Sequence, residues 1–470
     1  MIRVRRLRVW FLLVFLVFFT TAPYFWMTNG RVVHKDVFYN EPMRIKEGHI
    51  AGAVTVDRSL IADIQYFKCD KLFANDLVEL TKASAFLQQR NFTFPRRPDE
   101  NFIELTMNCD NFKESRGYFV YPPTQEEKSF PIAFNILFHQ NVEQLERLLR
   151  AIYRPQNQYC IHVDGKTSED VLNIVTQIAY CFPNVFIATE LEIVIYASAT
   201  RLSADINCMK DHVNKRFQWY YLLNLASSEY PIMTNLQIVQ ILKQFNGSND
   251  IHEVFSTMDE GRFKKKHYTF IDLYGKSGYM IHTDKQKEPP PHNLKITKGN
   301  AYNIFSRAFV EWFLSNPIAR DLLAWSMDTL TPDEHFWATL NNLYSNPHLK
   351  TPGGYTGHPD TKPFFARYIG WNSSTHRERC KMGHYVHNIC VFSVLDLPNI
   401  KDRYEIIANK FDIEYDPIAY RCMEEFILNN VLNEKNISNN VVYPAHFPPS
   451  VPIMDSIRQW KGTKQSGLGF

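Results

Sequence analysis

Two adjacent carboxylates, Asp333 and Glu334, stand within residues 331–339 (TPDEHFWAT), where an apolar helix is expected to begin. A glutamate held at a cleft can act as a general base and take a proton from a hydroxyl group. The same residues also suit a helix start, because Thr331 fits the N-cap and Glu334 completes a capping box three residues later. Locally the pattern favours the capping interpretation, so the rest of the chain has to decide.

Several other motifs that would define the chemistry are absent from the sequence. There is no G-x-G-x-x-G or G-x-x-x-x-G-K-[ST] loop for a phosphate, and no C-x-x-C pair for zinc or redox chemistry. No Asp-x-Asp occurs either, and the nearest approaches are residues 190–192 (ELE) and 412–414 (DIE). A hard cation such as Mn²⁺ or Mg²⁺ prefers clustered carboxylates, so no metal site is expected.

The elements that must position these residues follow from the hydrophobic pattern. Strands are expected at 132–138, 159–163, 185–188 and 219–224, with helices at 142–152, 169–180 and 199–212. Strands that alternate with helices predict an α/β fold, with a mostly parallel sheet and helices on both faces. Ligands bind such sheets at the carboxyl ends of strands, and Asp164 directly follows the second strand. Residues 28–125 lack a clear period and are expected to be irregular, as is an exposed loop at 285–291.

The composition is that of a folded protein. Of the 470 residues, 45% are hydrophobic and 14% are aromatic, which indicates a substantial core. The formal net charge of +3 is small for this length, and no basic block with interleaved aromatics occurs outside the extreme N-terminus. The run Lys264-Lys265-Lys266 is a short exception, which is more typical of a solvated loop than of a polyanion site. Nucleic acid is therefore not an expected partner. The length allows two domains or one large α/β domain with appendages.

The N-terminus predicts a membrane anchor. Arginines at positions 3, 5, 6 and 8 precede an uncharged segment at 9–27, which is just long enough to span a bilayer core. The arginines would stay cytoplasmic, so the remainder of the chain would lie on the far side of the membrane. The alternative is a cleaved signal peptide. Pro23 directly after Ala22 is a poor context for cleavage, which favours the uncleaved anchor.

Cysteines and glycosylation sequons are consistent with a luminal location. Eight cysteines form an even set, and the sequence alone does not choose among their many pairings. Sequons of the N-x-[ST] type lie at Asn91, Asn246, Asn372 and Asn436. Together with the anchor, these features favour the secretory pathway.

Longer motifs carry a resemblance to a known family. They are residues 148–164 (LLRAIYRPQNQYCIHVD), 196–198 (YAS), 204–210 (ADINCMK), 331–339 (TPDEHFWAT) and 408–412 (ANKFD). In this order they resemble the core-2/I-branching β1,6-N-acetylglucosaminyltransferases, over nearly the whole expected luminal part. A smaller set of the same motifs marks the related protein xylosyltransferases.

The resemblance implies a type II Golgi membrane enzyme with a GT-A-like fold. Members of this family transfer a sugar from a UDP donor with inversion, and they do so without a metal ion or an Asp-x-Asp motif. By resemblance Glu334 is the base that deprotonates the acceptor hydroxyl, while Asp333 supports the helix start. The resemblance therefore turns the local interpretation in favour of catalysis.

Donor-binding residues are implied by their positions in the matching motifs. Leu137, Asp164 and Tyr196 would line the uridine pocket, and Lys410 would contact the diphosphate. The family has an arginine that shares this contact, but His387 stands at its position here. A histidine is only partly charged near neutral pH and does not make the bidentate contact of arginine. Donor binding then depends on a protonated His387, on a neighbouring cation that replaces it, or on a different arrangement.

The resemblance also implies acceptor-binding residues. They are Trp371, Arg262 and, with a two-residue shift of the alignment, Glu253. An aromatic face such as that of Trp371 can stack on a sugar. Asp259 and Ser373 replace a lysine and a tyrosine of the family, so the acceptor and the donor sugar can differ from those of the relatives.

The family pattern further implies how the cysteines pair. The implied disulfides are Cys69–Cys422, Cys109–Cys181, Cys160–Cys208 and Cys380–Cys390. The first of these would tie the start of the luminal domain to its end and constrain the unfolded chain strongly.

The expected protein is thus an inverting, metal-independent glycosyltransferase of the Golgi membrane. It would transfer a sugar, with GlcNAc as the leading candidate, from a UDP donor to an O-glycan-type glycan or glycoprotein and form a β1,6 branch. Alternatives are transfer of glucose or xylose from its UDP donor, and a non-catalytic sugar-binding luminal protein. No cofactor is expected, and a homodimer is one open oligomeric state. The expected boundaries are a cytoplasmic tail at 1–8, an anchor at 9–27, a luminal stem at 28–65, a catalytic domain at 66–425 and a C-terminal tail at 426–470. Within the catalytic domain, a Rossmann-like half at 130–245 would bind the nucleotide sugar, and a half at 246–425 would hold the acceptor and the catalytic residue.

Overall fold

The computed structural model describes residues 66–88, 98–118, 122–215, 217–255, 260–373 and 380–434. All of them belong to one structural unit, Ala53–Phe470. The expected cytoplasmic tail, signal anchor and stem lie outside the described residues, as do the sequons at Asn91 and Asn436. Among the helices that are described, none is long and apolar enough to cross a bilayer.

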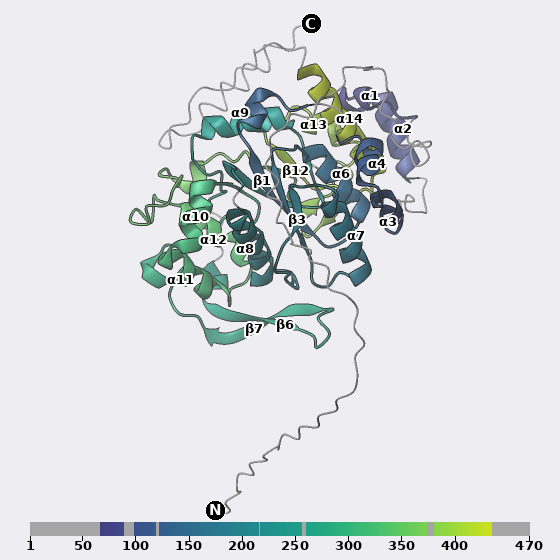
Figure 1. The fold of residues 1–470 in the computed structure, drawn as a ribbon. Helices are drawn as coiled ribbons and strands as arrows, with labels where there is room; N and C mark the ends of the chain where they lie inside the picture. The colour runs from purple at the N-terminus through teal and green to yellow at the C-terminus, as the bar shows by residue number, and fades with distance from the viewer. Residues whose placement is uncertain are drawn as a thin grey trace, which may run out of the picture. The chain divides into compact units, whose positions relative to one another are not determined.

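The central sheet has five strands in the order β3-β2-β1-β4-β8 (Figure 1). They are β1 (Ile132–Phe138), β2 (Gln158–Val163), β3 (Val185–Ile187), β4 (Tyr221–Ala226) and β8 (Ile304–Ser306). The first four run parallel to one another, and β8 is antiparallel to β4. The predicted mostly parallel sheet is therefore confirmed, with each predicted strand close to its expected range.

Side chains of β1 alternate between two hydrophobic cores, one on each face of the sheet. Ile132, Phe134 and Ile136 belong to the first core. That core also contains α6 (Val142–Ile152), α7 (Glu169–Tyr180) and α9 (Asn235–Phe245). Ala133 belongs to the second core, on the face covered by α8 (Ala199–Asn214), α10 (Arg307–Ser315), α11 (Pro317–Ser326) and α12 (Phe336–Asn341), as Figure 1 shows. Helices on both faces confirm the α/β prediction.

A third core brings together the two ends of the described chain. A second sheet, in the order β5-β12-β9, packs there with several helices, α2 (Leu77–Gln88) and those given next among them. These elements are β5 (Glu229–Pro231), β9 (Arg367–Ile369), β12 (Ile407–Asn409), α1 (Cys69–Phe73), α13 (Leu397–Ile400) and α14 (Pro417–Glu434). Because β12 leads directly into Lys410, this sheet positions one of the candidate donor residues.

Two antiparallel ribbons lie outside these sheets. The longer consists of β6 (Lys265–Ile271) and β7 (Gly278–Gln286), and the shorter of β10 (Tyr385–Val386) and β11 (Ile389–Cys390). The loop expected at 285–291 is shorter than predicted, because residues 285 and 286 still belong to β7 and a 3-10 helix, η2, follows at Pro291–Asn293. The end of β7 is polar and exposed, so its sequence shows no strand pattern there.

The interpretation of residues 28–125 as irregular is wrong for the part that the structure describes. After α1 come α2 (Leu77–Gln88), α3 (Asn101–Thr106), α4 (Cys109–Arg116) and α5 (Gln125–Lys128). Asn108 accepts hydrogen bonds from two N–H groups at the start of α4, and Thr124 forms a capping box with Glu127. The helices α3, α4 and α5 have eight residues or fewer, so they show no clear period, and caps and packing stabilise them rather than a long amphipathic face.

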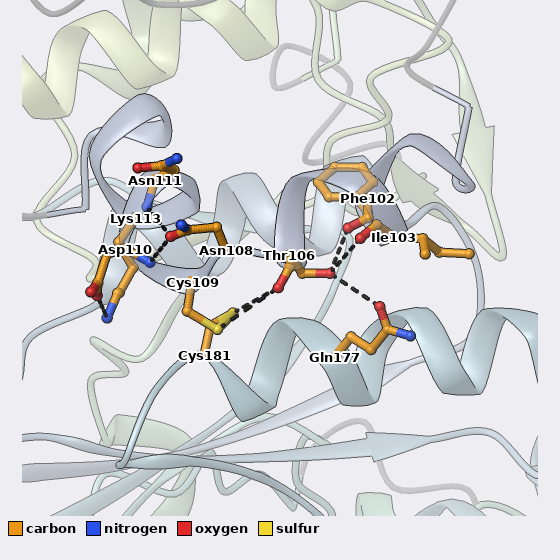
Figure 2. Close-up of a disulfide and its surroundings, with 10 residues drawn as sticks. All are labelled: Phe102, Ile103, Thr106, Asn108, Cys109, Asp110, Asn111, Lys113, Gln177 and Cys181. Atoms are coloured by element: carbon orange, nitrogen blue, oxygen red, sulfur yellow. Dashed lines mark hydrogen bonds and ion pairs between the residues drawn. A yellow bond between two sulfur atoms is a disulfide. The ribbon is translucent and has the colours of Figure 1, made fainter.

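All eight cysteines are paired, and the pairing implied by the family pattern is confirmed. The Cys109–Cys181 disulfide ties α4 to the end of α7 (Figure 2). Thr106 lies beside it and donates a hydrogen bond from Oγ1 to Gln177 Oε1 at 3.2 Å. The Cys69–Cys422 disulfide joins α1 to α14 across a sequence separation of 353. These two bonds fasten the N-terminal helices to the sheet domain.

Candidate active site

The turn that carries Glu334 differs from the capped helix start that the sequence suggested. Residues Pro332–Glu334 form a 3-10 turn, η3, and α12 begins only after His335. Thr331 adopts a left-handed conformation with a φ of 46°, and its side chain makes no cap hydrogen bond. The capping-box interpretation is therefore wrong. The box does not form because the Thr331 hydroxyl accepts a hydrogen bond from a residue outside the turn.

That residue is Arg262, which holds the catalytic candidate and its turn together. Its Nη1 donates to Thr331 Oγ1 at 2.7 Å and to Glu334 Oε2 at 3.0 Å. Arg262 belongs to the 3-10 helix η1 (Glu260–Phe263), directly before β6. The Glu334 side chain is 30% exposed. A charge-assisted bond of this kind fixes the orientation of the carboxylate, while the side chain stays open to a substrate.

The neighbouring Asp333 lies in the opposite environment. Its side chain is buried, and its Oδ2 is 3.4 Å from Nε of Arg201 in α8. Arg201 also donates to Asp205 at 3.0 Å, so one guanidinium bridges two buried carboxylates. Burial raises the pKa of Asp333 to about 6, although the Arg201 charge opposes this shift. The ion pair fits the predicted supporting role of Asp333, and the two adjacent acids suit different tasks.

Asp164 stands at the carboxyl end of β2, as the sequence predicted. Its Oδ1 accepts hydrogen bonds from the backbone N–H groups of Lys166 at 3.0 Å and Val194 at 3.2 Å. The Lys166 ammonium lies 3.2 Å from Oδ2. Leu137 lies near the end of the neighbouring strand β1, between β2 and β4. Asp164 thus connects the end of the sheet to the loop between β3 and α8.

His139, directly after β1, is a residue that sequence reasoning missed. Burial lowers its pKa, the charge of Asp164 opposes this shift, and the charges of Lys166 and Lys410 add to it. His139 therefore lies close enough for its pKa to respond to Asp164, the uridine candidate, and to Lys410, the diphosphate candidate. The available signal was a polar residue that directly follows a buried strand at the ligand-binding edge of a parallel sheet.

Three other donor candidates meet although they are far apart in the sequence. The rings of Tyr196 and His387 stack, with centroids 4.4 Å apart and an interplanar angle of 24°. The Lys410 ammonium donates to the backbone carbonyl of Val386 at 3.1 Å, next to His387. Burial lowers the pKa of Lys410, while the charge of Asp412 opposes the shift. Tyr196 is 68% exposed, so the stack stays accessible to a ligand.

One loop connects these donor candidates with the turn that carries Glu334. The loop between β3 and α8 binds Asp164 through its backbone and stacks on His387 through Tyr196. The next residue, Ala197, accepts a hydrogen bond from the backbone N–H of Thr331 at 2.8 Å. The donor candidates and the acidic turn therefore form one contiguous site at the carboxyl edge of the sheet.

The predicted acceptor residues differ in their placement. Arg262 contacts Glu334, as described above. Trp371 is partly buried and forms a backbone bridge with Ile389, beside the turn that carries His387. Glu253 is 1% exposed, Asn341 donates to its carboxylate, and burial raises its pKa to about 7. The side chain is closed to solvent in this structure, so the acceptor role of Glu253 stays a prediction.

Two of the four sequons fall in the described part of the chain. Asn246 follows α9 in a left-handed conformation. The backbone N–H of Asn372 donates to the carbonyl of Asn388 at 2.9 Å. Both asparagines are exposed, as an attached glycan requires, and their occupancy stays a prediction.

Comparisons with known proteins extend these observations. The model of the core-2/I-branching enzyme family matches residues 132–401. A beta-1,3-galactosyl-O-glycosyl-glycoprotein beta-1,6-N-acetylglucosaminyltransferase 3 of Ovis aries is 38% identical over 347 residues, or 71% of this chain and 76% of the relative. The Homo sapiens protein of the same name is 38% identical over 342 residues, or 70% and 75% of the two chains. A similarly named transferase of Bovine herpesvirus 4 is 38% identical over 351 residues, or 72% and 77%.

The class of protein follows from the fold and these matches together. The α/β domain with its parallel sheet and four disulfides fits a GT-A-like glycosyltransferase, and this chain is an enzyme of the β1,6-N-acetylglucosaminyltransferase-like type. It belongs to the core-2/I-branching enzyme family. The family match spans the central sheet and the turn that carries Glu334, and the resemblance that the motifs indicated is confirmed.

Proposed function

We propose that this chain is an inverting glycosyltransferase that uses Glu334 as its general base. It transfers N-acetylglucosamine from a UDP donor to the 6-hydroxyl of a sugar in an O-glycan-type acceptor. The acceptor oxygen bonds to the anomeric carbon as the bond from that carbon to UDP breaks, and Glu334 takes the hydroxyl proton. The observation that carries the proposal is the Arg262–Glu334 ion pair, on a turn that one loop joins to the donor candidates.

Glu334 suits the role of base better than its neighbour Asp333. A base must reach the hydroxyl that it deprotonates, and the side chain of Glu334 is partly exposed. Asp333 is buried against Arg201, so its carboxylate is not open to an acceptor hydroxyl. We therefore assign proton transfer to Glu334 and positioning of the turn to Asp333.

The growing negative charge on the departing UDP needs stabilisation, which we assign to cations of the protein. Lys410 is the first candidate, since its ammonium lies at the carbonyl of Val386, the residue before His387, and its charge lowers the pKa of His139. In the described ranges no group of three or more His, Cys, Asp or Glu side chains could hold a metal ion. Metal-independent transfer is part of the proposal, and the lack of an Asp-x-Asp motif in the sequence supports it.

The donor sugar and the acceptor are inferred from the relatives. The three described above are each named as transferases that form a beta-1,6 linkage of N-acetylglucosamine on beta-1,3-galactosyl-O-glycosyl-glycoproteins. We extend this activity to the present chain. A Golgi location as a type II membrane protein goes with it, supported by the uncharged segment at 9–27, the disulfides and the sequons.

The proposal is tested with the purified full-length chain and an acceptor that carries a galactosyl-β1,3 O-glycan. UDP-GlcNAc, UDP-glucose and UDP-xylose are compared, each with and without EDTA. We expect transfer from UDP-GlcNAc at the same rate in EDTA, with a new β1,6 linkage in the product. Preference for another donor would support the related transferase instead. Sugar binding without transfer from any donor would support the non-catalytic alternative, and loss of transfer in EDTA would contradict the metal-free step.

A further inference from the structure

The β6–β7 ribbon exposes an apolar surface that the proposed reaction does not use. Six of the eighteen exposed large hydrophobic side chains among the described residues lie in this ribbon and its turn: Tyr268, Phe270, Leu273, Tyr274, Tyr279 and Ile281. Figure 1 shows the ribbon beside α11, outside the layers of the central sheet. A ribbon that packs one face on the protein usually turns a polar face to water. Apolar side chains concentrated on the outer face therefore indicate a binding surface.

Four of these side chains form a ladder, which we call the aromatic ladder: Tyr268, Phe270, Tyr279 and Ile281. Phe270 lies directly opposite Tyr279, with ring centroids 5.1 Å apart, and Tyr268 lies opposite Ile281. Their exposed fractions lie between 39% and 60%. The alternate residue Thr269 points to the other face and donates to the sulfur of the cross-strand Met280. The ladder is thus a continuous outward face rather than a set of isolated side chains.

Both ends of the ribbon adjoin the proposed active site. β6 directly follows the 3-10 helix that carries Arg262, the partner of Glu334. At the other end, Gly278 packs so closely on Ile195 that a Cβ atom at this glycine would lie 2.5 Å from Ile195 Cδ1. Ile195 precedes Tyr196, the residue stacked on a donor candidate. The inner face of the ribbon therefore lies against the site, and an acceptor chain bound near Glu334 passes the edge of the ribbon to reach the ladder on its outer face.

The ribbon is also positively charged. Residues 264–287 contain six lysines and two aspartates. Asp272 accepts four hydrogen bonds within the turn, and Asp284 lies 2.5 Å from the ammonium of Lys265. Both carboxylates keep their negative charge, and six lysines against two aspartates leave this segment with a formal charge of +4. The lysines without a carboxylate partner among the described residues are Lys264, Lys276 and Lys285. This excess of positive charge complements an acidic ligand.

We propose that the aromatic ladder is a second glycan-binding site, which holds the outer sugars of an extended, acidic acceptor chain. The inference rests on the proposed function, because it extends the acceptor site of the same enzyme. Aromatic rings offer flat apolar faces to pyranose rings, while the lysines attract the carboxylate or sulfate groups of acidic sugars. Successive rungs on a strand are spaced about 7 Å apart, which suits a chain of sugars that leads away from Glu334.

The test measures binding by the purified full-length chain in the absence of donor, so that it does not depend on turnover. The probes are an extended sialylated O-glycan and the neutral disaccharide core, compared by calorimetry. The variant Phe270→Thr/Tyr279→Thr removes one rung and keeps residues that favour strands. We expect it to bind the sialylated glycan about 10-fold more weakly and the disaccharide unchanged. The matched control is Tyr180→Thr, an 87% exposed tyrosine at the end of α7, and it should bind both probes normally.

The proposal would be overturned if the unmodified chain bound the two probes equally well. It would also be overturned if the ladder variant bound the sialylated glycan as tightly as the unmodified chain does. If the variant instead loses binding to phosphatidylcholine vesicles or loses a dimer in sedimentation, with glycan binding intact, the ladder serves a membrane or a second copy and the proposal is wrong. Failure of the proposed function looks different. In that case no UDP-sugar is transferred, while ladder-dependent glycan binding persists and supports this site.

Discussion

The Arg262 guanidinium lies 3.0 Å from the Glu334 carboxylate and 2.7 Å from the Thr331 hydroxyl, so one side chain fixes both the candidate base and its turn. The resemblance to the family suggested Arg262 only as an acceptor residue. From its contacts we infer that Arg262 also positions Glu334, because an unheld glutamate on a 3-10 turn would sample several orientations. A displacement of a catalytic group by about 1 Å can lower the reaction rate by about 100-fold.

The first prediction concerns this ion pair. Arg262→Gln removes the cation and should lower kcat by about 100-fold, because Glu334 loses its fixed orientation. Arg262→Lys keeps a charge without the forked geometry, so it should recover part of the rate. Steady-state kinetics at saturating donor and acceptor provide the measurement. Unchanged turnover in Arg262→Gln would show that the ion pair does not position the base.

The second prediction concerns His387. An arginine at this position is charged at every relevant pH, can bind a diphosphate with two hydrogen bonds, and can stack on Tyr196 as the histidine does. His387→Arg should therefore lower the donor KM near pH 7 by about 10-fold. The matched variant is His384→Arg. The ring of His384 stacks on Tyr415 rather than on Tyr196, with centroids 4.2 Å apart. A gain only in His384→Arg would move the phosphate contact to that residue, and a loss in His387→Arg would show that the histidine is no weakened phosphate ligand.

The third prediction concerns the pH dependence of stability. Burial raises the pKa of Glu253 from an ordinary 4.5 to about 7. Between these values the folded state holds a proton that the unfolded state has lost, so the free energy of unfolding should fall as the pH rises. The full effect is about 3 kcal/mol. Glu253→Gln should remove this contribution, seen as a smaller difference between urea unfolding at pH 4.5 and pH 7. The exposed control Glu169→Gln should keep the difference, and an equal change in both variants would contradict the prediction.

The fourth prediction compares two disulfides. Cys69–Cys422 closes a sequence separation of 353, and Cys380–Cys390 closes one of 10. Replacement of the first pair by serine should cost about 3 kcal/mol more stability than replacement of the second, because the longer loop gains more chain entropy when released. The second replacement should instead raise the donor KM, since this disulfide brackets the turn that carries His387. Urea unfolding and donor titrations separate the two effects. Equal losses of stability would contradict the entropic argument.

The central sheet was predictable because its elements carry their own signals. The run Ile132–Phe138 is apolar enough to be buried on both faces, and residues 142–152 have a clear helical period, so strand and helix agree with the structure. The helices near the N-terminus lack such a period. Their stability comes from caps such as Asn108, from packing and from disulfides, which a local pattern does not reveal.

The candidate site was only partly predictable. Motifs pointed to Glu334 and Asp164, and the structure places both at the same edge of the sheet. The residues that suit a capping box form a 3-10 turn instead, in which the Thr331 hydroxyl accepts a hydrogen bond from Arg262. Contacts between residues distant in the sequence, such as the stack of Tyr196 on His387, leave no local signal. The aromatic ladder was missed for a different reason. Its alternating pattern is that of an ordinary strand, and only the structure shows which face is exposed.

The most direct test of the central claim is the rate of sugar transfer by Glu334→Gln in the full-length chain. Glutamine keeps the size of the side chain and a hydrogen-bond acceptor for Arg262, but it cannot take the proton of the acceptor hydroxyl. A lost general base lowers the rate by roughly 100- to 10,000-fold, so we expect kcat to fall in that range while the donor and acceptor KM values change little. Transfer by Glu334→Gln at the rate of the unmodified chain would contradict the assignment of Glu334 as the catalytic base.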